Sequence, residues 1–259
     1  DLVRSRGLGD VYKRQGCQLQ IVNLEEQILD LLGAVDVVTW REAMSEQSDP
    51  FDIALVEGSI TREEEVERLQ WIRDHAKVLV PIGACACIGG INCIKNRFDL
   101  EEVRRYVYGE HAELFDTMAT RPLSTVVTVD AEVPGCPINR QELVETVKAL
   151  LLGKKPALPT YAVCVECKRR NNVCVFDQGL VCLGPVSRAG CTAICPTYGN
   201  RCVGCRGLVP EPNLNSHREV LAQYGLATDD ILRFFNLYGG CLPETSCLQS
   251  AMEATGGPR

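Results

Sequence analysis

Cysteines are the residues whose number and spacing point most directly to chemistry in this chain. Eight of the 15 cysteines fall between residues 164 and 205. They form two groups of four, Cys164, Cys167, Cys174 and Cys182, then Cys191, Cys195, Cys202 and Cys205. Each group contains a C-x-x-C pair, and four thiolates at such spacing are typical ligands of zinc or of an iron–sulfur cluster.

Disulfide bonds are a second interpretation of so many cysteines, and they fit poorly. Disulfide scaffolds are typical of small secreted chains that lack a hydrophobic core. This chain has 259 residues, is 46% hydrophobic and carries an odd number of cysteines. Metal ligation is therefore the favoured interpretation. Spacing alone leaves both zinc and iron–sulfur clusters open for the second half.

Charge and hydropathy argue against two classes of protein. The formal net charge is −7, whereas a nucleic-acid-binding domain presents a basic face. The sequence has no apolar run long enough for a membrane-spanning helix, which needs 18 or more such residues. We therefore expect a globular protein that binds no nucleic acid and spans no membrane.

The first half of the chain alternates between predicted strands and predicted helices. Short runs rich in Val and Ile, with few alternating polar residues, predict buried parallel strands. Apolar residues at helical spacing predict amphipathic helices between them. The predicted strands span 35–40, 52–57, 78–83 and 124–129, and the predicted helices span 18–32, 62–75, 99–107 and 140–152. This alternation is typical of an α/β fold with a doubly wound, flavodoxin-like parallel sheet.

A linker with two prolines, residues 154–162, separates two regions of different character. After it the chain is rich in loops, cysteines and glycines, and one further helix is expected at about 228–238. We therefore expect a flavodoxin-like domain over 16–155 and a loop-rich, metal-binding domain over 160–259. Residues 1–15 have no strand pattern where a strand should precede the first helix. We interpret this segment as foreign or artefactual.

Three further cysteines are expected to meet at one edge of the predicted sheet. Cys85 and Cys136 each follow a predicted strand, and Cys17 opens the first helix, where a strand should end. The carboxyl ends of parallel strands form the edge at which ligands bind. Helices that begin after Cys17 and Cys136 would direct N–H groups toward anionic thiolates. The pattern predicts a metal site built from three separate loops, which structural zinc sites rarely use.

Four segments resemble a known family, the small subunits of [NiFe] hydrogenases. They are "GCQLQIVNLEEQILDLL" (16–32), "VEGSI" (56–60), "PIGACACIGGI" (81–91) and "VPGCPINRQELVETVKALLLGKKP" (133–156). The resemblance covers about residues 16 to 240. It is greatest to the cytoplasmic type, which includes the sulfhydrogenase delta subunit and the F420-non-reducing hydrogenase small subunit. The 20 kDa subunit of NADH:ubiquinone oxidoreductase resembles the first half only.

The resemblance implies three [4Fe–4S] clusters, each of which takes four thiolates. It assigns the proximal cluster to Cys17, Cys85 and Cys136, here called the proximal set. In the family the first motif is C-x-G-C, and Arg14 occupies the place of its first cysteine, so the proximal set lacks a fourth thiolate. The distal set is Cys164, Cys167, Cys174 and Cys182, and the medial set is Cys191, Cys195, Cys202 and Cys205. An interleaved assignment of these eight stays open.

The resemblance also implies a function and partners. A separate large subunit would carry the nickel–iron site that activates H₂, so this chain would supply no catalytic residue. The clusters would relay electrons between that subunit and a soluble redox partner, through a further acceptor subunit with a flavin or a ferredoxin-like centre. The expected location is cytoplasmic. The alternatives are an iron–sulfur subunit of another oxidoreductase complex, such as a respiratory one, and a zinc-bound scaffold.

Several residues near these sites have no assigned role. Glu57 ends a predicted strand at the same sheet edge. It is expected to tune the proximal cluster or pass protons, or else to act as a hydrogen-bonding carboxylate. Unassigned cysteines are expected to be buried thiols that behave as small apolar residues, with Cys87 also a candidate surrogate ligand. They are Cys87, Cys93, Cys241 and Cys247. The three histidines, His75, His111 and His217, are expected at the surface.

Overall fold

A computed structural model of the chain describes residues 16–25, 29, 33–40 and 51–245. The segment interpreted as foreign, residues 1–15, lies outside the described residues, and so does Cys247. Within the described part of the chain, no helix combines the length and the apolar character needed to cross a membrane.

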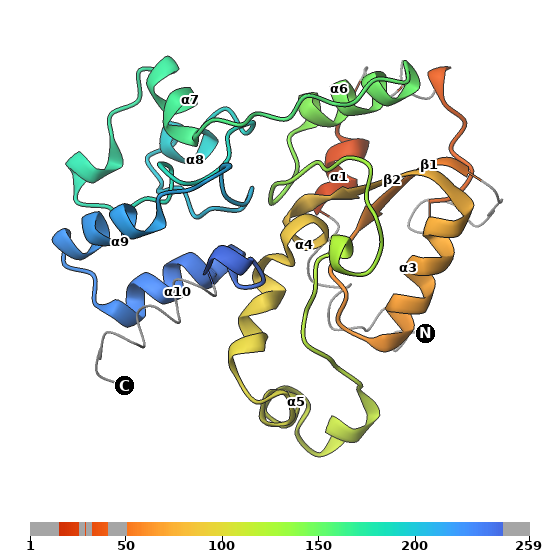
Figure 1. The fold of residues 1–259 in the computed structure, drawn as a ribbon, viewed down its shortest axis with the longest axis horizontal. Helices are drawn as coiled ribbons and strands as arrows, with labels where there is room; N and C mark the ends of the chain where they lie inside the picture. Colours follow the sequence, from red (N-terminus) through yellow and green to blue (C-terminus); the bar gives the residue numbers. More distant parts are fainter. Residues whose placement is uncertain (1–15, 26–28, 30–32, 41–50, 246–259) are drawn as a thin grey trace.

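The first half is built on a small parallel sheet (Figure 1). Strand β1, Phe51–Glu57, pairs in parallel with strand β2, Ala76–Ile82, along their whole length. Helix α3, Glu63–His75, makes the crossover between them. Both strands and this helix were predicted from the sequence, and the structure confirms them. Among the described residues, the sheet contains these two strands.

Two of the predicted strands are wrong. Residues 35–40 contain a single bridge residue, Thr39, and form no strand. Within 124–129, the chain instead forms the end of a short 3₁₀ helix, η3, Leu123–Thr125, followed by a turn. The apolar side chains of this run pack against the cluster that contains Leu79. The Val-rich pattern therefore correctly indicated partial burial, but it does not reflect strand pairing.

The segment that runs beside β2 lies a few residues further along the chain. The Asp130 backbone N–H donates to the Leu79 carbonyl at 3.0 Å, and the Val133 N–H donates to the Pro81 carbonyl at 2.9 Å. Val133 also forms an isolated parallel bridge with Ile82. This segment lies beside β2, where the strand 124–129 was expected, and leads directly to Cys136.

Most predicted helices of the first half are confirmed. Helix α5 spans Leu100–Tyr108 and helix α6 spans Arg140–Leu151. The Asn139 side chain caps α6 by accepting from the Glu142 N–H at 3.1 Å, as its sequence pattern predicts. Helix α1, Gly16–Val22, is shorter than the predicted span 18–32, and part of that span lies outside the described residues.

The remaining elements are short. Helix α4 spans Gly83–Ile88, and the 3₁₀ helices η1 and η2 span Gly90–Arg97 and Gly109–Leu114. The second half contains α7 (Val163–Arg169), η4 (Val175–Gln178), α8 (Ile194–Thr197), α9 (Leu214–Gln223) and α10 (Thr228–Gly239). Helix α10 confirms the predicted helix at 228–238.

Strand β2 is buried on both faces, which makes the first half doubly wound. On one face, Val80 and Ile82 pack with Leu143 of α6. On the other face, Leu79 packs with Leu69 of α3 and with Leu123. Figure 1 shows α6 and α3 on opposite sides of the two strands. Burial of both faces explains why this strand reads as a continuous apolar run.

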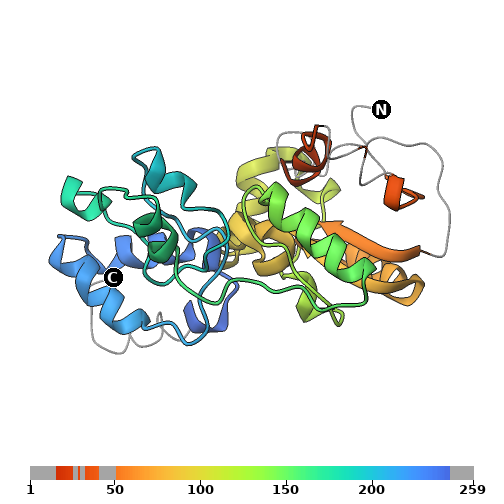
Figure 2. The same cartoon turned by 90° about the horizontal axis from the view of Figure 1, so that it is seen from above.

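The second half is rich in loops, as predicted, and lies beside the first half in both views (Figures 1 and 2). Its core gathers residues of α9 and α10, including Leu221 and Phe235, around Val181 and Leu183. Helix α10 then reaches back to the first half, where Tyr238 packs against the buried cluster of α4. Figure 1 shows α7 and α8, which carry several of the cysteines, above α9 and α10.

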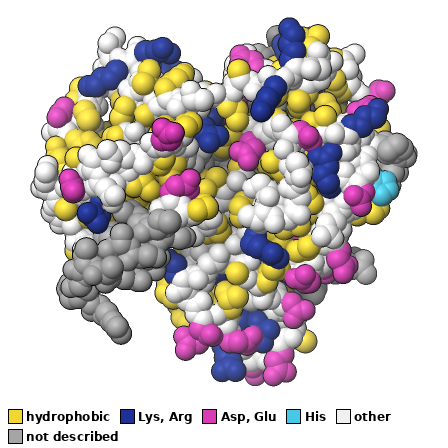
Figure 3. Space-filling model, viewed as in Figure 1, with side chains coloured by type: hydrophobic (Ala, Val, Ile, Leu, Met, Phe, Trp, Pro, Cys, Tyr) yellow, Lys and Arg dark blue, Asp and Glu magenta, His cyan; other side chains and the backbone are white. Residues whose placement is uncertain are grey.

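Charged side chains of both signs are mixed on the face seen in Figure 3, most clearly over α5 at the bottom of the view. Helix α5 carries Glu101, Glu102 and Arg105 in its first and last turns. That face presents no continuous basic patch of the kind that nucleic-acid binding uses.

Candidate functional site

The proximal set lies around the carboxyl end of β2. Cys85 belongs to α4, which starts directly after β2. The loop that leads to Cys136 pairs with the start of α4, since the Gly83 N–H donates to the Val133 carbonyl at 2.8 Å and the Ala84 N–H donates to the Gly135 carbonyl at 2.7 Å. The structure therefore connects these two cysteine loops by backbone hydrogen bonds, as expected for the sheet edge.

Cys17 approaches the same place from α1. A Cβ atom on Gly83 would lie 2.5 Å from the Cys17 sulfur, and Gly83 has a φ of +86°. Glycine is therefore required at this position, both for the backbone conformation and for the close approach. Burial, the Glu57 carboxylate and the neighbouring thiols of Cys136 and Cys85 raise the pKa of the Cys17 thiol to about 12.

Glu57 lies against Cys17, at the end of β1. The Cys17 N–H donates to Glu57 Oε1 at 3.4 Å. The second carboxylate oxygen, Oε2, is buried and has no hydrogen-bond partner. Burial raises the pKa of Glu57, although the hydrogen bonds from Cys17 and Gln18 act to lower it. The sequence correctly predicted that this residue would lie at the sheet edge.

The distal set gathers around Gly184. A Cβ atom on Gly184 would lie 3.3 Å from the sulfur of Cys164 and 3.3 Å from that of Cys182. Burial, followed by the thiols of Cys182, Cys167 and Cys174, raises the pKa of Cys164 to about 11. The thiols of the other three cysteines of this set therefore all act on Cys164.

Two backbone donors point at the sulfur of Cys182. The Gly184 N–H donates to it at 3.3 Å, and the Cys202 N–H donates to it at 3.2 Å. Such bonds stabilise thiolate charge and raise the reduction potential of a cluster that the sulfur binds. This arrangement fits a thiolate ligand better than a thiol that only fills space.

The medial set lies between the other two sets. Burial raises the pKa of Cys205 to about 12, with further contributions from the thiols of Cys191, Cys136 and Cys195. Burial also raises the pKa of Cys202 to about 12, with contributions from the thiols of Cys182 and Cys205. Neighbouring thiols therefore extend from Cys136 through Cys205 and Cys202 to Cys182.

These sites fit iron–sulfur clusters by the chemistry of their donors. All eleven predicted ligands are thiols rather than halves of a disulfide. Among the described residues, no three side chains of His, Cys, Asp or Glu converge closely enough to bind one metal ion. The four thiolates of a [4Fe–4S] cluster each bind a different iron, so they need not approach one another as closely as the ligands of one ion.

Two unassigned cysteines are not the buried thiols that were expected. Cys93 and Cys241 form a disulfide across 148 residues, with their Cα atoms 5.7 Å apart. The prediction was wrong because it considered each cysteine separately, while η1 and the end of α10 bring this pair together. Cys87 is a buried thiol, as predicted, and its sulfur contacts the Pro81 carbonyl at 3.4 Å.

The histidine predictions are confirmed in part. His111 is exposed, and His75 is half-buried and stacks on Trp71. His217 was expected at the surface but is buried between Phe176 and Phe235. Burial lowers its pKa, against a hydrogen bond with the Cys182 backbone. Its helical spacing from the buried Leu214 and Leu221 is the signal that could have indicated burial.

Tyr238 of α10 is a residue near the site that sequence reasoning missed. Burial raises its pKa, and so do a hydrogen bond with Cys136 and the nearby thiols of Cys205 and Cys85. Its phenol therefore lies between the proximal and medial sets. No spacing signal in the sequence relates this helix residue to cysteines more than 30 positions away.

Comparison with known proteins gives consistent matches. A family model described as the NADH ubiquinone oxidoreductase 20 Kd subunit matches residues 15–150. The Sulfhydrogenase 2 subunit delta of Pyrococcus furiosus is 34% identical over 221 residues, which cover 84% of this chain and 92% of that protein. A vhu subunit of the F420-non-reducing hydrogenase of Methanococcus voltae is 31% identical and covers 84% of this chain and 86% of that protein.

A solved structure is also similar to this chain. It is that of an NAD⁺-reducing [NiFe]-hydrogenase in the H₂-reduced state, with a TM-score of 0.51 and 28% sequence identity. The similarity covers 56% of this chain and 89% of the other.

Proposed function

The chain belongs to the family of [NiFe] hydrogenase small subunits, which share a domain with the NADH ubiquinone oxidoreductase 20 kDa subunit, and on this premise we propose that it relays electrons through three iron–sulfur clusters. It is an oxidoreductase subunit, and the H₂-activating site lies on another chain. The predicted membership of this family is confirmed by the relatives.

The continuity of the thiols is the observation that supports the relay most directly. The thiol of Cys136 raises the pKa of Cys205, and the thiol of Cys205 raises the pKa of Cys202. The Cys202 N–H in turn donates to the Cys182 sulfur at 3.2 Å. An iron–sulfur cluster, when bound, accepts and donates single electrons. The chain's own residues would hold the clusters in sequence, shield them from water by burial, and direct backbone N–H groups at sulfur. In this proposal the proximal set would exchange electrons with the large subunit, and the distal set with the redox partner.

The cluster assignments are part of this proposal. The proximal set would bind the first cluster at the edge of the domain over 16–155. The distal and medial sets would bind two [4Fe–4S] clusters in the domain over 160–259. Position 14, where the family carries a cysteine, is Arg14 and lies outside the described residues. A thiol at this position would give the proximal set its fourth ligand.

The partners follow from the same reasoning. The large subunit with the nickel–iron centre would contact the proximal side, and an acceptor subunit with a flavin or a ferredoxin-like centre would contact the distal side. The expected location is cytoplasmic, because the sequence resembles the cytoplasmic type of this family.

A second candidate, an iron–sulfur subunit of a respiratory complex, is favoured by the name of the matching family model over residues 15–150. The eight cysteines between residues 164 and 205 favour the hydrogenase function instead, since the respiratory 20 kDa subunit resembles the first half only. Purification of the chain together with its large subunit, followed by exposure to H₂, separates the two functions. The hydrogenase proposal predicts H₂-dependent reduction of the clusters in the presence of the large subunit, and its absence would favour the respiratory alternative.

A pair of matched substitutions tests the ligand assignment. In anaerobically prepared protein, Cys182→Ala should lose about four irons together with the signal of one cluster in the electron paramagnetic resonance (EPR) spectrum. Cys87→Ala is the control, because Cys87 is also buried but contacts the Pro81 carbonyl. Equal iron contents in the two variants would show that Cys182 is not a cluster ligand. Zinc in place of iron would contradict the electron relay itself.

A further inference from the structure

One arginine is buried beside the cysteine sites without being a ligand of any of them. Arg206 directly follows Cys205, and 2% of its side chain is exposed. It forms a two-pronged ion pair with Glu142 of α6, of which 11% is exposed. Nη1 lies 2.8 Å from Oε2, and Nη2 lies 2.6 Å from Oε1. A planar guanidinium favours this geometry, which a lysine cannot reproduce.

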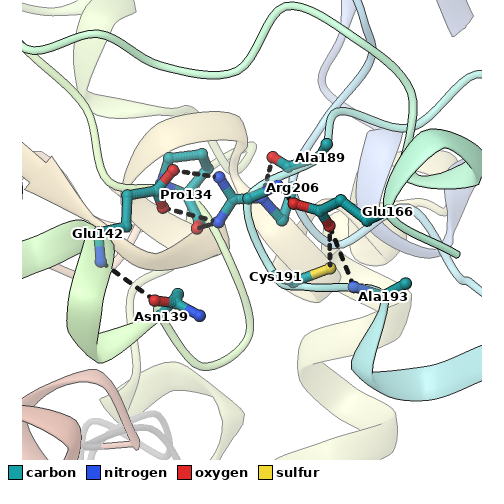
Figure 4. Close-up of polar contacts among 9 residues, drawn as sticks. Pro134, Asn139, Glu142, Glu166, Ala189, Cys191, Ala193 and Arg206 are labelled. Carbon is teal, nitrogen blue, oxygen red and sulfur yellow. Dashed lines mark hydrogen bonds and ion pairs between the residues drawn. The ribbon is translucent and has the colours of Figure 1, made fainter. Parts of the chain in front are cut away.

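The same guanidinium joins three cysteine loops (Figure 4). Nη1 also donates to the Pro134 carbonyl, two residues before Cys136. Nε donates at 2.7 Å to the Ala189 carbonyl, two residues before Cys191. The side chain therefore connects the loop of the proximal set with both ends of the medial set.

Gly190 shows how closely the chain approaches this ion pair. Its φ is +113°, and an added Cβ atom would lie 2.2 Å from Nη2 of Arg206 and 2.7 Å from Oε1 of Glu142. Only glycine fits here without moving the pair. The medial loop is thus packed directly onto the link between Arg206 and Glu142.

A second carboxylate makes the corresponding connection to the distal set. Glu166 lies in α7, between Cys164 and Cys167. Its Oε1 accepts from the Gly190 N–H at 2.9 Å, and its Oε2 accepts from the Ala193 N–H at 3.0 Å. These two donors flank Cys191, and Figure 4 shows Glu166 and Arg206 on either side of this loop.

A buried ion pair is a costly way to hold a structure together. Removing two charges from water opposes folding, and apolar residues of similar volume often stabilise a protein as well or better. Position and charge, however, matter for an electron relay. Electron tunnelling slows steeply with distance between centres, and a buried cation stabilises the reduced, more negative state of a nearby cluster.

We propose that Arg206 is a positioning residue of the relay: through Glu142, Pro134 and Ala189 it fixes the separation of the proximal and medial clusters, and its charge raises the reduction potential of the medial cluster. This inference rests on the proposed function. The guanidinium would thus have two separable roles. Its hydrogen bonds would fix the separation of the proximal and medial clusters, and its charge would raise the reduction potential of the medial cluster.

Three substitutions separate these tasks in the complex with the large subunit. Arg206→Met removes both fork and charge, and Arg206→Lys removes the fork but keeps the charge. Arg73→Met is the matched control, because Arg73 pairs with Asp130 through a partly exposed ion pair on the far side of β2. The readouts are iron content, EPR-monitored potentials of each cluster, magnetic coupling between clusters, and the rate of cluster reduction by H₂.

We expect Arg206→Met to disfavour reduction of the medial cluster roughly tenfold, which corresponds to about 59 mV for one electron. It should also weaken the coupling between the proximal and medial clusters and slow reduction of the medial cluster. Arg206→Lys should recover most of the potential but not the coupling or the rate. Arg73→Met should match the unaltered protein in all four measurements.

The outcomes distinguish this inference from the proposed function. An unaltered protein without iron–sulfur signals would overturn the proposed function, and with it the premise. If the unaltered protein holds its clusters and Arg206→Met has the same cluster potentials and the same coupling, the inference is overturned while the proposed function stands. If Arg206→Met loses its iron, the Arg206→Lys variant tests the positioning role. Magnetic coupling between the proximal and medial clusters equal to that of the unaltered protein would contradict this role. Weakened coupling would support it.

Discussion

The proximal set and the eight cysteines of the second half are held in place by different kinds of structure. Cys85 follows strand β2, and Cys136 follows the strand-like segment that hydrogen-bonds to β2. Leu79 and Val80 of β2 are fully buried. The proximal set is therefore attached to a scaffold that exists without its cluster.

Among the described residues, the cysteine loops of the second half are joined by isolated bridges, such as Ala162 with Arg188 and Ser187 with Leu208, and not by a sheet. Their local apolar cluster consists of Val163, Val175 and Ala193 together with the thiols of Cys182 and Cys202. Two backbone N–H groups there, those of Gly184 and Cys202, donate to the sulfur of Cys182. The comparison teaches that the first half should position its cluster, whereas bound clusters should position the loops of the second half.

Removal of iron should therefore have the largest effect on folding, and it should destabilise the cysteine loops of the second half more than the sheet of the first half. Metal binding to unformed sites can supply on the order of 10 kcal/mol of folding free energy, as in structural zinc sites. After anaerobic chelation, amides of residues 163–206 should exchange rapidly, while those of β1 and β2 should stay protected. Hydrogen-exchange mass spectrometry measures both segments in one experiment. Equal loss of protection in the two regions would abolish the distinction.

A core substitution should affect the first half alone. Leu143 of α6 is fully buried in the cluster that covers β2, and Leu143→Ala should lower the free energy of unfolding by about 3 kcal/mol. Leu152→Ala is the control, since that side chain is 70% exposed and its loss should cost less than about 0.5 kcal/mol. Denaturant titration gives both values. EPR signals of the medial and distal clusters should persist at low denaturant in both variants.

The disulfide between Cys93 and Cys241 offers a smaller test of how the two regions are joined. It closes a loop of 148 residues from η1 to the end of α10, so Cys241→Ser should lower the stability of oxidised protein by about 3 kcal/mol. In the presence of a thiol reductant, the variant and the unaltered protein should have the same melting temperature. A difference that persists under reducing conditions would assign the effect to packing instead.

The smallest expected effect concerns Asp130, which joins the strand-like segment to β2. Its carboxylate accepts from the Leu79 N–H at 2.7 Å and pairs with Arg73. Although partial burial opposes it, these partners lower the pKa of Asp130. A lowered folded-state pKa stabilises the protein above the usual Asp value of about 4, and this contribution disappears as the pH falls through the folded-state pKa.

Asp130→Asn should therefore lose about 0.5 kcal/mol at pH 7, since the pair is partly exposed. The difference from the unaltered protein should shrink as the pH falls below about 4. Denaturant titrations at several pH values measure this dependence. A difference that grows at low pH would contradict the assigned direction.

Much of the arrangement could be predicted because its signals are local. The spacing of eight cysteines and the apolar runs of β1 and β2 each depend on neighbouring residues. So does the cap formed by Asn139 and Glu142. These features therefore appear in the sequence as short patterns.

The parts that could not be predicted depend on contacts across the fold. Arg206 meets Glu142 across 64 positions, and Cys93 meets Cys241 across 148. No periodicity relates residues so far apart. The run 124–129 misled for a different reason, since its apolar side chains pack against a core without joining the sheet.

The number of irons per chain tests the central claim of three four-iron sites most directly. The unaltered chain, with Arg14 and three proximal thiols, should retain about eight irons after anaerobic gel filtration, and Arg14→Cys should retain about twelve with equal sulfide. About eight irons or fewer in Arg14→Cys, or zinc in their place, would contradict the account.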